Sequence, residues 1–310
     1  MEASVNTINT EVEKKDNKKN IYKAKDITLK VLIYAFLTLI AIFSILPFYW
    51  MIITSLKTEA EYRLSVPTFF PHTFMWKNYS FAVTYGSDLF LQSLINTLII
   101  GLASTALSVI ITVITAYAFA KMEFKGKNLL FSILLATMMI PGEIYTTTNY
   151  ITVGRNGLNW NNTYIVMIIP FLVSIYYIYL LRNAFKQIPD TLYKAAKVDG
   201  ITDVGFLVKV MVPLTAPTLI SITLLKFIGT WNSYIWPRLV NKDTNWQLIS
   251  NWLTQGFVDN KGELYEVASN DPLVTVKMAA ALMVSLPLFV LFIFFRKYIM
   301  HGVSRSGTKG

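Results

Sequence analysis

Long uncharged apolar runs constrain this chain more than any other feature. Four runs carry no charged residue over 18 positions or more: Val31–Ile53, Leu91–Ala120, Thr163–Leu181 and Met278–Phe295. An α-helix rises about 1.5 Å per residue, so about 20 such residues cross the roughly 30 Å hydrocarbon core of a bilayer. Each run therefore predicts a membrane-spanning helix.

Two further apolar runs carry one charge each. They are Leu129–Val153, which contains Glu143, and Val212–Trp236, which contains Lys226. The 310 residues are 54% hydrophobic and only 15% charged, too apolar for one soluble core of this size. We predict an all-α integral membrane protein with six transmembrane helices.

The distribution of basic residues predicts the orientation of these helices. With the N-terminus in the cytosol, the four cytosolic segments contain 19 Lys and Arg and the three outer loops contain 7, while Lys226 and Lys277 complete the 28. Positive charge accumulates on the cytosolic side of membrane proteins, so both termini are expected to be cytosolic. The net charge of +10 therefore indicates membrane topology, and no nucleic-acid partner is expected.

The basic start of the chain, Lys14–Lys30, followed by an apolar run, also fits a signal peptide. That apolar run is too long for a signal peptide and lacks an Ala-x-Ala-like exit, so a retained first helix is the preferred interpretation. The sequence contains no cysteine, which excludes disulfides, thiol catalysis and cysteine metal sites.

The predicted spans divide the chain into four parts. Residues 1–28 form a cytosolic basic tail, mobile or interfacial; 29–90 hold the first transmembrane helix and an outer loop; 91–300 form a core of five transmembrane helices; and 301–310 form a cytosolic tail. The core includes a cytosolic loop at 183–212. The first outer loop, Lys57 to about Phe90, has enough aromatic surface to fold over the membrane face. The last outer loop, Pro237 to about Thr275, mixes aromatic and acidic residues, which suits a polar partner surface or a self-packed cap. A kink or break is expected at Pro141-Gly142, because proline removes a backbone donor.

The cytosolic loop between spans four and five has its own helical pattern. Asp190 is placed to cap the start of a short helix, and Gly200 to end it in a left-handed turn. A second short helix is expected after Thr202, running to Pro213. Small alanines within the first helix and apolar side chains at Leu192, Val198 and Phe206 favour insertion into a groove on another protein.

This loop resembles the coupling loop of binding-protein-dependent ABC importer permeases. That pattern is roughly Glu-Ala-Ala, three residues, Gly, nine or more residues, then an apolar-Pro ending, and the chain has LYKAAKVDGITDVGFLVKVMVPLTAP at Leu192–Pro217. Further pieces are MMIPGEIYTTTNY at Met138–Tyr150, FIGTWNSYIWP at Phe227–Pro237 and the tail GVSRSGTKG at Gly302–Gly310. Together they are similar to the second membrane subunit of carbohydrate importers of the maltose and multiple-sugar type.

The resemblance implies a subunit of the bacterial cytoplasmic membrane that works with several partners. It implies a second homologous permease in a heterodimer, two cytosolic ATPase subunits, an external solute-binding protein and membrane lipid. ATP and Mg would be held by the ATPases, with no cofactor and no metal site in this chain, which has no GxxxxGK[ST] phosphate loop. No catalytic residue is expected.

By the same resemblance, a set of loop residues would sit in a cleft of the ATPase. These coupling residues are Lys194, Ala195, Ala196, Asp199, Gly200, Phe206 and Pro213. Lys194 stands where the family has a glutamate, so its ammonium would meet an acid on the partner instead. The competing interpretation is an amphipathic linker helix on the membrane surface.

A second set of residues is a candidate translocation path. Lys226 falls near mid-bilayer, where an ammonium needs an inward face, a partner or a polar path, and Glu143 raises the same question nearer the outer end of its span. Polar and aromatic residues join them in two clusters: Asn149, Tyr150, Trp231, Asn232 and Tyr234. A paired or snorkelling lysine and an interfacial aromatic belt are the competing interpretations.

Other classes of function were weighed against the importer. An ion-coupled secondary carrier using Glu143 and Lys226 leaves the cytosolic loop unexplained, and matching broken helices in two halves are not apparent. An intramembrane enzyme needs clustered acid, base or nucleophile groups, and the two histidines, His72 and His301, lie on opposite sides of the membrane. Within the importer class, a carbohydrate is preferred over a glycerol phosphodiester or a phosphorylated or anionic solute by resemblance alone.

Overall fold

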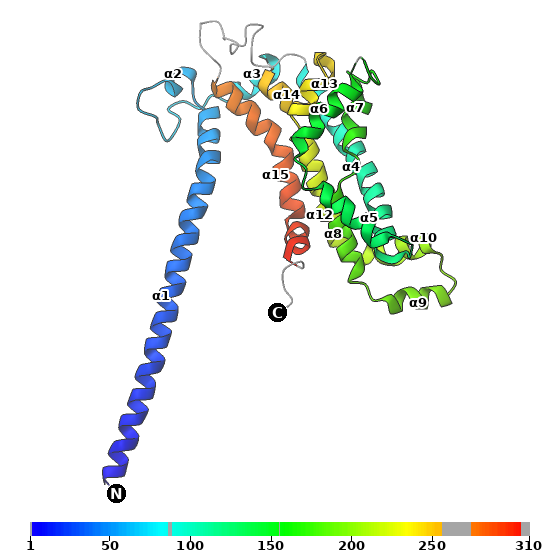
Figure 1. The fold of residues 1–310 in the computed structure, drawn as a ribbon. Helices are drawn as coiled ribbons and strands as arrows, with labels where there is room; N and C mark the ends of the chain where they lie inside the picture. Colours follow the sequence, from blue (N-terminus) through cyan, green and yellow to red (C-terminus); the bar gives the residue numbers. More distant parts are fainter. Residues whose placement is uncertain (1, 86–88, 155, 256–273, 305–310) are drawn as a thin grey trace. The chain divides into compact units, whose positions relative to one another are not determined.

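A computed structural model of the chain describes residues 2–85, 89–154, 156–255 and 274–304, and side chains within them except at 2–26, 85, 143, 255 and 299–304. The described residues form helices and no strand, as predicted (Figure 1). The chain divides into two compact units, Met1–Met75 and Trp76–Gly310, which are considered separately.

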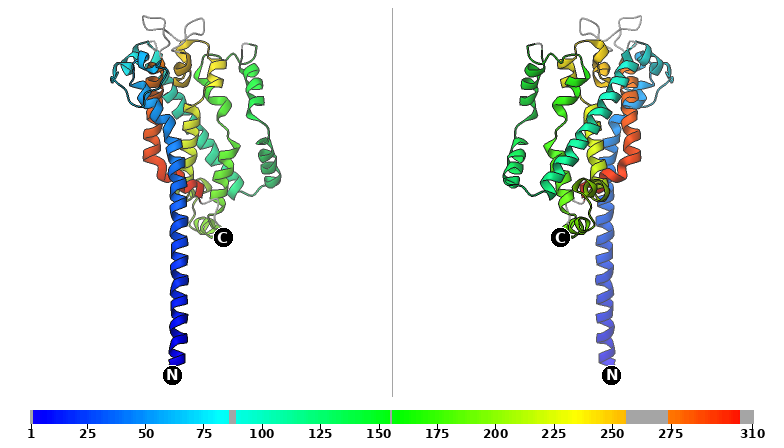
Figure 2. Two further views of the ribbon diagram at one scale, coloured as in Figure 1. Left: turned by 90° about the vertical axis from the view of Figure 1, so that its left-hand side faces the viewer. Right: turned by 90° about the vertical axis from the view of Figure 1, so that its right-hand side faces the viewer.

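The first unit consists of one long helix and a loop. Helix α1 (Glu2–Ser55) contains the first predicted span, since Ile27–Ser55 is long and apolar enough to cross a membrane, and its backbone is helical through the predicted tail (Figure 2). Short helix α2 (Glu59–Tyr62) follows. The loop then returns toward α1, where the Tyr49 hydroxyl donates a hydrogen bond to the carbonyl of Phe69.

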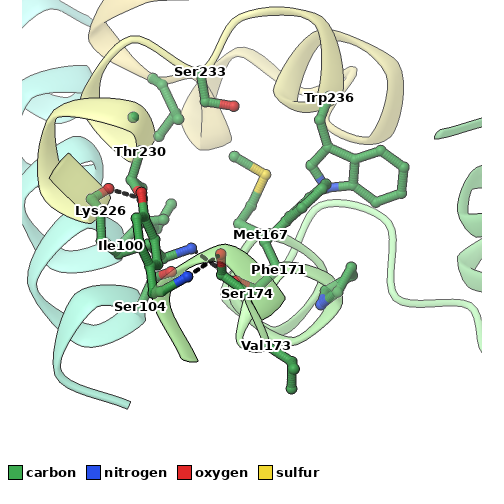
Figure 3. Close-up of a pocket in the computed structure, with 14 residues that line it drawn as sticks. Ile100, Ser104, Met167, Phe171, Val173, Ser174, Lys226, Thr230, Ser233 and Trp236 are labelled. Atoms are coloured by element: carbon green, nitrogen blue, oxygen red, sulfur yellow. Dashed lines mark hydrogen bonds between the residues drawn. The ribbon is translucent and has the colours of Figure 1, made fainter. Parts of the chain in front are cut away.

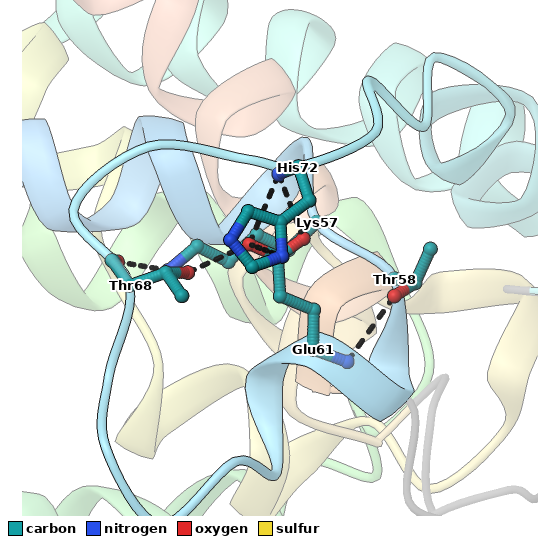
Figure 4. Close-up of polar contacts among 5 residues, drawn as sticks. All are labelled: Lys57, Thr58, Glu61, Thr68 and His72. Atoms are coloured by element: carbon teal, nitrogen blue, oxygen red, sulfur yellow. Dashed lines mark hydrogen bonds and ion pairs between the residues drawn. The ribbon is translucent and has the colours of Figure 1, made fainter.

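A buried carboxylate holds this loop together, as Figure 4 shows. Glu61 accepts a hydrogen bond from the Thr68 hydroxyl at 2.6 Å and from the His72 backbone N–H at 3.1 Å. The Lys57 ammonium donates to the carbonyl of Thr68. Burial alone would raise the pKa of Glu61, but these hydrogen bonds and the nearby His72 and Lys57 charges hold that pKa below its ordinary value. The loop is therefore a self-packed element.

Helix α4 (Leu89–Lys121) is the central element of the second unit, packing on both α8 (Ile175–Lys186) and α12 (Ala216–Trp231). Its buried face consists largely of small residues: Ser93, Thr97, Gly101, Ser104, Thr105, Ser108, Thr112 and Ala116. Small side chains let membrane helices approach closely. At Gly101 the approach is so close that an added Cβ would lie 2.9 Å from the Phe227 ring.

The remaining helices of the second unit complete the bundle around α4. They are α3 (Lys77–Tyr85), α5 (Lys127–Thr137), α6 (Gly142–Val153), α7 (Tyr164–Ile168) with η1 (Ile169–Phe171), α9 (Asp190–Val198), α10 (Asp203–Phe206) with the π-helix η2 (Leu207–Met211), α11 (Val212–Leu214), α13 (Ile235–Val240), η3 (Thr244–Trp246), α14 (Ile249–Gln255) and α15 (Val274–Ser304). Figure 1 shows α9 and α10 at the opposite end of this unit from α13 and α14.

Three helices of the described chain are long and apolar enough to cross a membrane alone, namely Ile27–Ser55, Leu89–Lys121 and Val274–Tyr298. Two bent pairs raise the number to five, Tyr164–Phe171 with Ile175–Lys186 at 49° and Asp203–Leu214 with Ala216–Trp231 at 83°. The third predicted span, Leu129–Val153, is split into α5 and α6, and the 11-residue α5 covers only about 16 Å. Six spans and the cytosolic termini stay predictions.

Each of these helix breaks lies at or next to a proline. The expected break at Pro141-Gly142 is confirmed, because α5 ends at Thr137 and α6 begins at Gly142. Two features of the prediction were wrong. The fourth span is interrupted between Phe171 and Ile175, just after Pro170, and the fifth ends at Trp231, short of Trp236. Its sharp bend lies at Thr215, between two prolines that cannot donate to a helix ladder.

Asparagine side chains organise the end of the unit that carries α13 and α14. The fully buried Asn96 donates to the carbonyls of Asn245 and Gln247 at 2.8 and 3.1 Å and accepts from the Tyr164 hydroxyl at 3.0 Å. Asn162 accepts from the backbone of Lys242 at 3.0 Å. The described part of the last outer loop is thus a self-packed cap. The rest of that loop, 256–273, lies outside the described residues.

Candidate functional site

Helix α9, the predicted coupling helix, is fixed at its start by a residue from a distant helix. Pro189 occupies the N-cap position and Asp190 the first turn, so the prediction that Asp190 caps the helix was wrong. Its carboxylate instead pairs with the Lys121 ammonium at 2.5 Å, which also donates to the carbonyl of Ile188 at 2.8 Å. The hydrogen bond and charge of Lys121 hold the pKa of Asp190 below its ordinary value. The end of α4 therefore anchors the start of α9.

The end of α9 is a left-handed turn at Gly200, as predicted. Gly200 has φ 74°, its N–H donates to the carbonyl of Lys197 at 3.1 Å, and the N–H of Ile201 donates to the carbonyl of Ala196 at 2.9 Å. These two bonds define a Schellman motif, which glycine adopts without steric cost. Thr202 then caps α10 by accepting from the N–H of Gly205 at 3.1 Å. Backbone hydrogen bonds at Gly200 and the Thr202 cap therefore define the turn between the two short helices.

Asp203 ties α9, α10 and α4 together. Its Oδ1 accepts from the Tyr193 hydroxyl at 2.7 Å, pairs with the Lys197 ammonium at 2.9 Å and accepts from the Tyr117 hydroxyl at 3.4 Å. The hydrogen bonds from Tyr193 and Lys197 hold the pKa of the Asp203 carboxyl below its ordinary value. Asp203 therefore links the loop to α4 through side-chain hydrogen bonds.

The two alanines of α9, Ala195 and Ala196, differ in solvent exposure. Ala196 is buried and belongs, with the fully buried Phe206, to the apolar core formed by α4, α8 and α12. Phe206 is therefore an internal anchor, and the prediction that it offers an apolar contact to another protein was wrong. The exposed face carries Leu192, Lys194, Ala195, Val198 and Asp199. Pro213, in α11, is also exposed.

Lys226 lines a cavity of about 370 Å³ (Figure 3). The cavity lies among α4, the broken α7–α8 segment, α12 and α13. Its wall includes hydroxyl and aromatic side chains, namely Ser104, Ser174, Tyr177, Thr230, Ser233, Phe171 and Trp236, together with aliphatic residues such as Ile100, Met167 and Leu248. The Lys226 ammonium donates to the carbonyl of Phe171 at 2.7 Å, at the point where η1 ends. One face of α12 and the break before α8 therefore build a cavity within predicted spans, and its wall combines hydroxyl groups and one ammonium with apolar side chains.

The described side chains of the other residues predicted for a translocation path do not line this cavity. Trp231 is buried against Phe227 in a different cluster, while Asn232 is exposed. Tyr234 accepts from the Arg238 guanidinium. Asn149 and Tyr150 are half-buried on α6, and Tyr150 packs on the cluster around Trp236. The side chain of Glu143 lies outside the described residues, as does that of every residue in the Gly302–Gly310 tail.

Sequence reasoning missed the cavity's hydroxyl residues and the asparagine framework. Thr230 and Ser233 follow Lys226 at helical spacing, which was the available signal on α12. Asn96 was detectable as an amide within an uncharged run. Arg182 was also missed; it is buried, donates to the carbonyl of Phe119 at 3.0 Å and lies 3.8 Å from the centre of the Phe131 ring.

With three to five helical segments long and apolar enough to cross a membrane, the described chain has the make-up of a multi-pass membrane protein. Residues 108–305 match the family described as "Binding-protein-dependent transport system inner membrane component". Two relatives are permease proteins: the arabinooligosaccharides transport system permease AraQ of Bacillus subtilis, 26% identical over 91% of this chain and 96% of its own, and the sulfoquinovosyl glycerol transport system permease SmoH of Agrobacterium fabrum, 30% identical over 85% and 88%. A crystal structure of a bacterial ABC transporter that imports the acidic polysaccharide alginate matches with a TM-score of 0.77 at 25% identity, covering 88% of this chain and 97% of that one.

The chain belongs to this family of binding-protein-dependent permeases, in the group of sugar and oligosaccharide ABC importers. The resemblance seen in the sequence is confirmed. Members are multi-pass proteins of the inner membrane that serve as transport components and not as enzymes. The family implies a partner permease, an ATPase and a binding protein.

Proposed function

We propose that this chain is one of two unlike permeases that form a heterodimer, with two ATPase subunits on its cytosolic side. ATP and Mg would be bound by those ATPases. A carbohydrate, delivered by an external binding protein, would pass between the permeases. Support comes from the family and from relatives whose own substrates include arabinooligosaccharides and sulfoquinovosyl glycerol. The importer is favoured over an ion-coupled carrier.

The exposed face of α9 is the observation that carries the coupling role. Lys194, Ala195 and Asp199 are exposed, while Asp203 and the core around Phe206 fix the helix to α4 and α8. A displacement of α9 by a closing ATPase dimer would therefore move the membrane helices as well. A flexible linker could not transmit such a displacement, because its own bending would absorb it.

Lys194 would give this interface its charge specificity. Its side chain is exposed on α9 and replaces the family glutamate, so we infer that the ATPase cleft presents an acidic residue there. The charge reversal Lys194→Glu is expected to weaken ATPase association several-fold in low salt. Lys194→Arg, which keeps the charge, is expected to be close to wild type.

The cavity at Lys226 is the segment of the path that this chain contributes. Apolar ring faces of a sugar suit Phe171 and Trp236, and its hydroxyls suit Ser104, Thr230 and Ser233. A volume of about 370 Å³ lies within the usual range for small-ligand sites. We therefore place carbohydrate contact here instead of at Trp231 and Asn232.

The test is purification of the tagged full chain in mild detergent, identification of co-purifying subunits by mass spectrometry, and reconstitution with the binding protein in proteoliposomes. The expected result is recovery of a second permease and an ATPase, with ATP-dependent carbohydrate uptake. Uptake driven by an ion gradient from the chain alone would contradict the proposal.

A further inference from the structure

Among the residues that the structure describes, no aspartate or glutamate lines the cavity around the Lys226 ammonium. The described residues that line it include serine, threonine, tyrosine and apolar side chains, but neither aspartate nor glutamate. No ion pair involves Lys226 in the described part of the chain, whereas Lys121 and Lys197 each pair with a carboxylate. Ammonium groups within membrane spans are costly and normally find a counter-charge or a function.

The hydrogen-bonding capacity of this ammonium is only partly used. A lysine ammonium has three N–H donors, and the single described bond from Lys226 goes to the carbonyl of Phe171 at 2.7 Å. That bond satisfies a carbonyl left free where η1 ends, and it fixes the ammonium at the cavity wall. Two donors remain for a bound molecule.

The start of helix α8 adds positive potential to the same cavity. Ser174 caps this 12-residue helix, and both Ser174 and Tyr177 line the cavity (Figure 3). The N-terminus of a helix carries partial positive charge, and broken transmembrane helices use such ends to hold anionic substrate groups. The helix end reinforces the field that the ammonium establishes.

We propose that this cavity selects an acidic sugar, with a carboxylate or sulfonate oxygen of the solute pairing with the Lys226 ammonium. This inference rests on the proposed function and specifies its substrate class. The solute's anionic group supplies the counter-charge that the described cavity wall lacks. Ser104, Thr230 and Ser233 remain for the sugar hydroxyls, and Trp236 for an apolar ring face. Neutral sugars would leave two ammonium donors without a strong partner.

The experiment offers the reconstituted full transporter, with its co-purified partners and binding protein, a mixture of acidic and neutral oligosaccharides. The mixture contains oligogalacturonates with their carboxyl-reduced counterparts, and sulfonated oligosaccharides with unsulfonated counterparts of the same lengths. Mass spectrometry then identifies what accumulates with ATP. The expected result is at least about tenfold preference for an acidic class over its neutral counterpart. Preferential uptake of neutral sugars overturns the inference but leaves the proposed function intact, and no ATP-dependent uptake of any carbohydrate contradicts the proposed function itself.

Variants at Lys226 separate recognition from folding. Lys226→Gln is expected to reduce uptake of the preferred acidic oligosaccharide about tenfold and to spare its neutral counterpart, while Lys226→Arg keeps most of the preference. Lys242→Gln, which removes an exposed lysine outside the cavity, is the matched control. Membrane-inserted protein and basal ATPase activity are measured for each variant. An acidic preference that persists in Lys226→Gln would overturn the assignment.

Discussion

The predicted coupling loop, 183–212, and the Lys226 cavity are built in opposite ways. In the loop, residues a few positions apart form the turn at Gly200 and the cap at Thr202, and only the anchors from α4 come from afar. No single segment of the sequence contains all the residues that line the cavity. Its wall comes from α4, the α7–α8 break, α12 and α13, which meet only when the bundle packs.

This difference shows which functional feature is rigid and which is adjustable. The loop's hydrogen bonds fix its geometry, so changes on its exposed face should disturb a partner and leave the fold intact. The cavity wall consists of side chains from several packed helices, so a single substitution can change the chemistry of the wall.

The largest effect is expected at the exposed alanine of α9. Ala195→Trp should reduce binding-protein-stimulated ATPase activity and uptake by more than about tenfold, because a bulky side chain blocks close approach of a partner. Its thermal stability should match wild type. Ala196→Trp places the same side chain in the core and should instead cost about 1–3 kcal/mol of stability. Equal loss of stability in both variants would contradict the assigned faces.

A smaller effect is expected from filling the cavity. Gly229 lines it, and an added Cβ there would meet no atom within 4 Å. Gly229→Leu should therefore retain the fold and lower uptake several-fold. A Cβ added at Gly101, where α4 meets α12, would lie 2.9 Å from the Phe227 ring. Gly101→Leu should therefore be destabilised by about 1–3 kcal/mol. Thermal unfolding and uptake measured on both variants check the distinction, and normal uptake in Gly229→Leu would count against the cavity as part of the path.

The smallest effect is expected at Asp203. Asp203→Asn weakens the bonds to Tyr193 and Lys197, so amide hydrogen exchange in α9 should rise and coupling should fall a few-fold. Tyr193→Phe, which removes one of these bonds, should act in the same direction with a smaller effect.

Asp203 also makes a prediction about pH. Because its folded pKa is depressed, its stabilising contribution is present above the ordinary aspartate pKa of about 3.9 and is lost only as pH falls through the folded value. The activity ratio of Asp203→Asn to wild type should therefore be constant from pH 6 to 8. A ratio that changes across that window would contradict an Asp203 that stays ionised and bonded to Tyr193 and Lys197.

The sequence predicted features whose signals are local. Apolar runs predicted membrane helices, Gly200 predicted the left-handed turn, and Pro141-Gly142 predicted the helix break. Asp190 was misassigned as a cap because its partner, Lys121, lies 69 residues away. A pattern within one segment cannot reveal such a competitor.

The cavity could be predicted only in part for the same reason. Lys226 was identified from its cost in a membrane, yet the carbonyl of Phe171 that receives its hydrogen bond depends on an unforeseen break before α8. The aromatic side chains of Trp231 and Tyr234 suggested a path. In the structure, however, Trp231 is buried, and the Tyr234 hydroxyl accepts a hydrogen bond from Arg238. Rotation about a helix axis is decided by neighbouring helices, which the local pattern does not specify.

The exposed face of α9 is proposed to meet an ATPase. The chain has no cysteine, so Ala195→Cys introduces a single reactive thiol without further changes. Short-range cross-linking of this variant in native membranes, with Lys242→Cys as a control on the outer loop, tests the claim directly. A cross-link from position 195 to a nucleotide-binding subunit, altered by ATP, is the predicted result. Cross-links only to lipid or to this chain, with the complex intact, would contradict it.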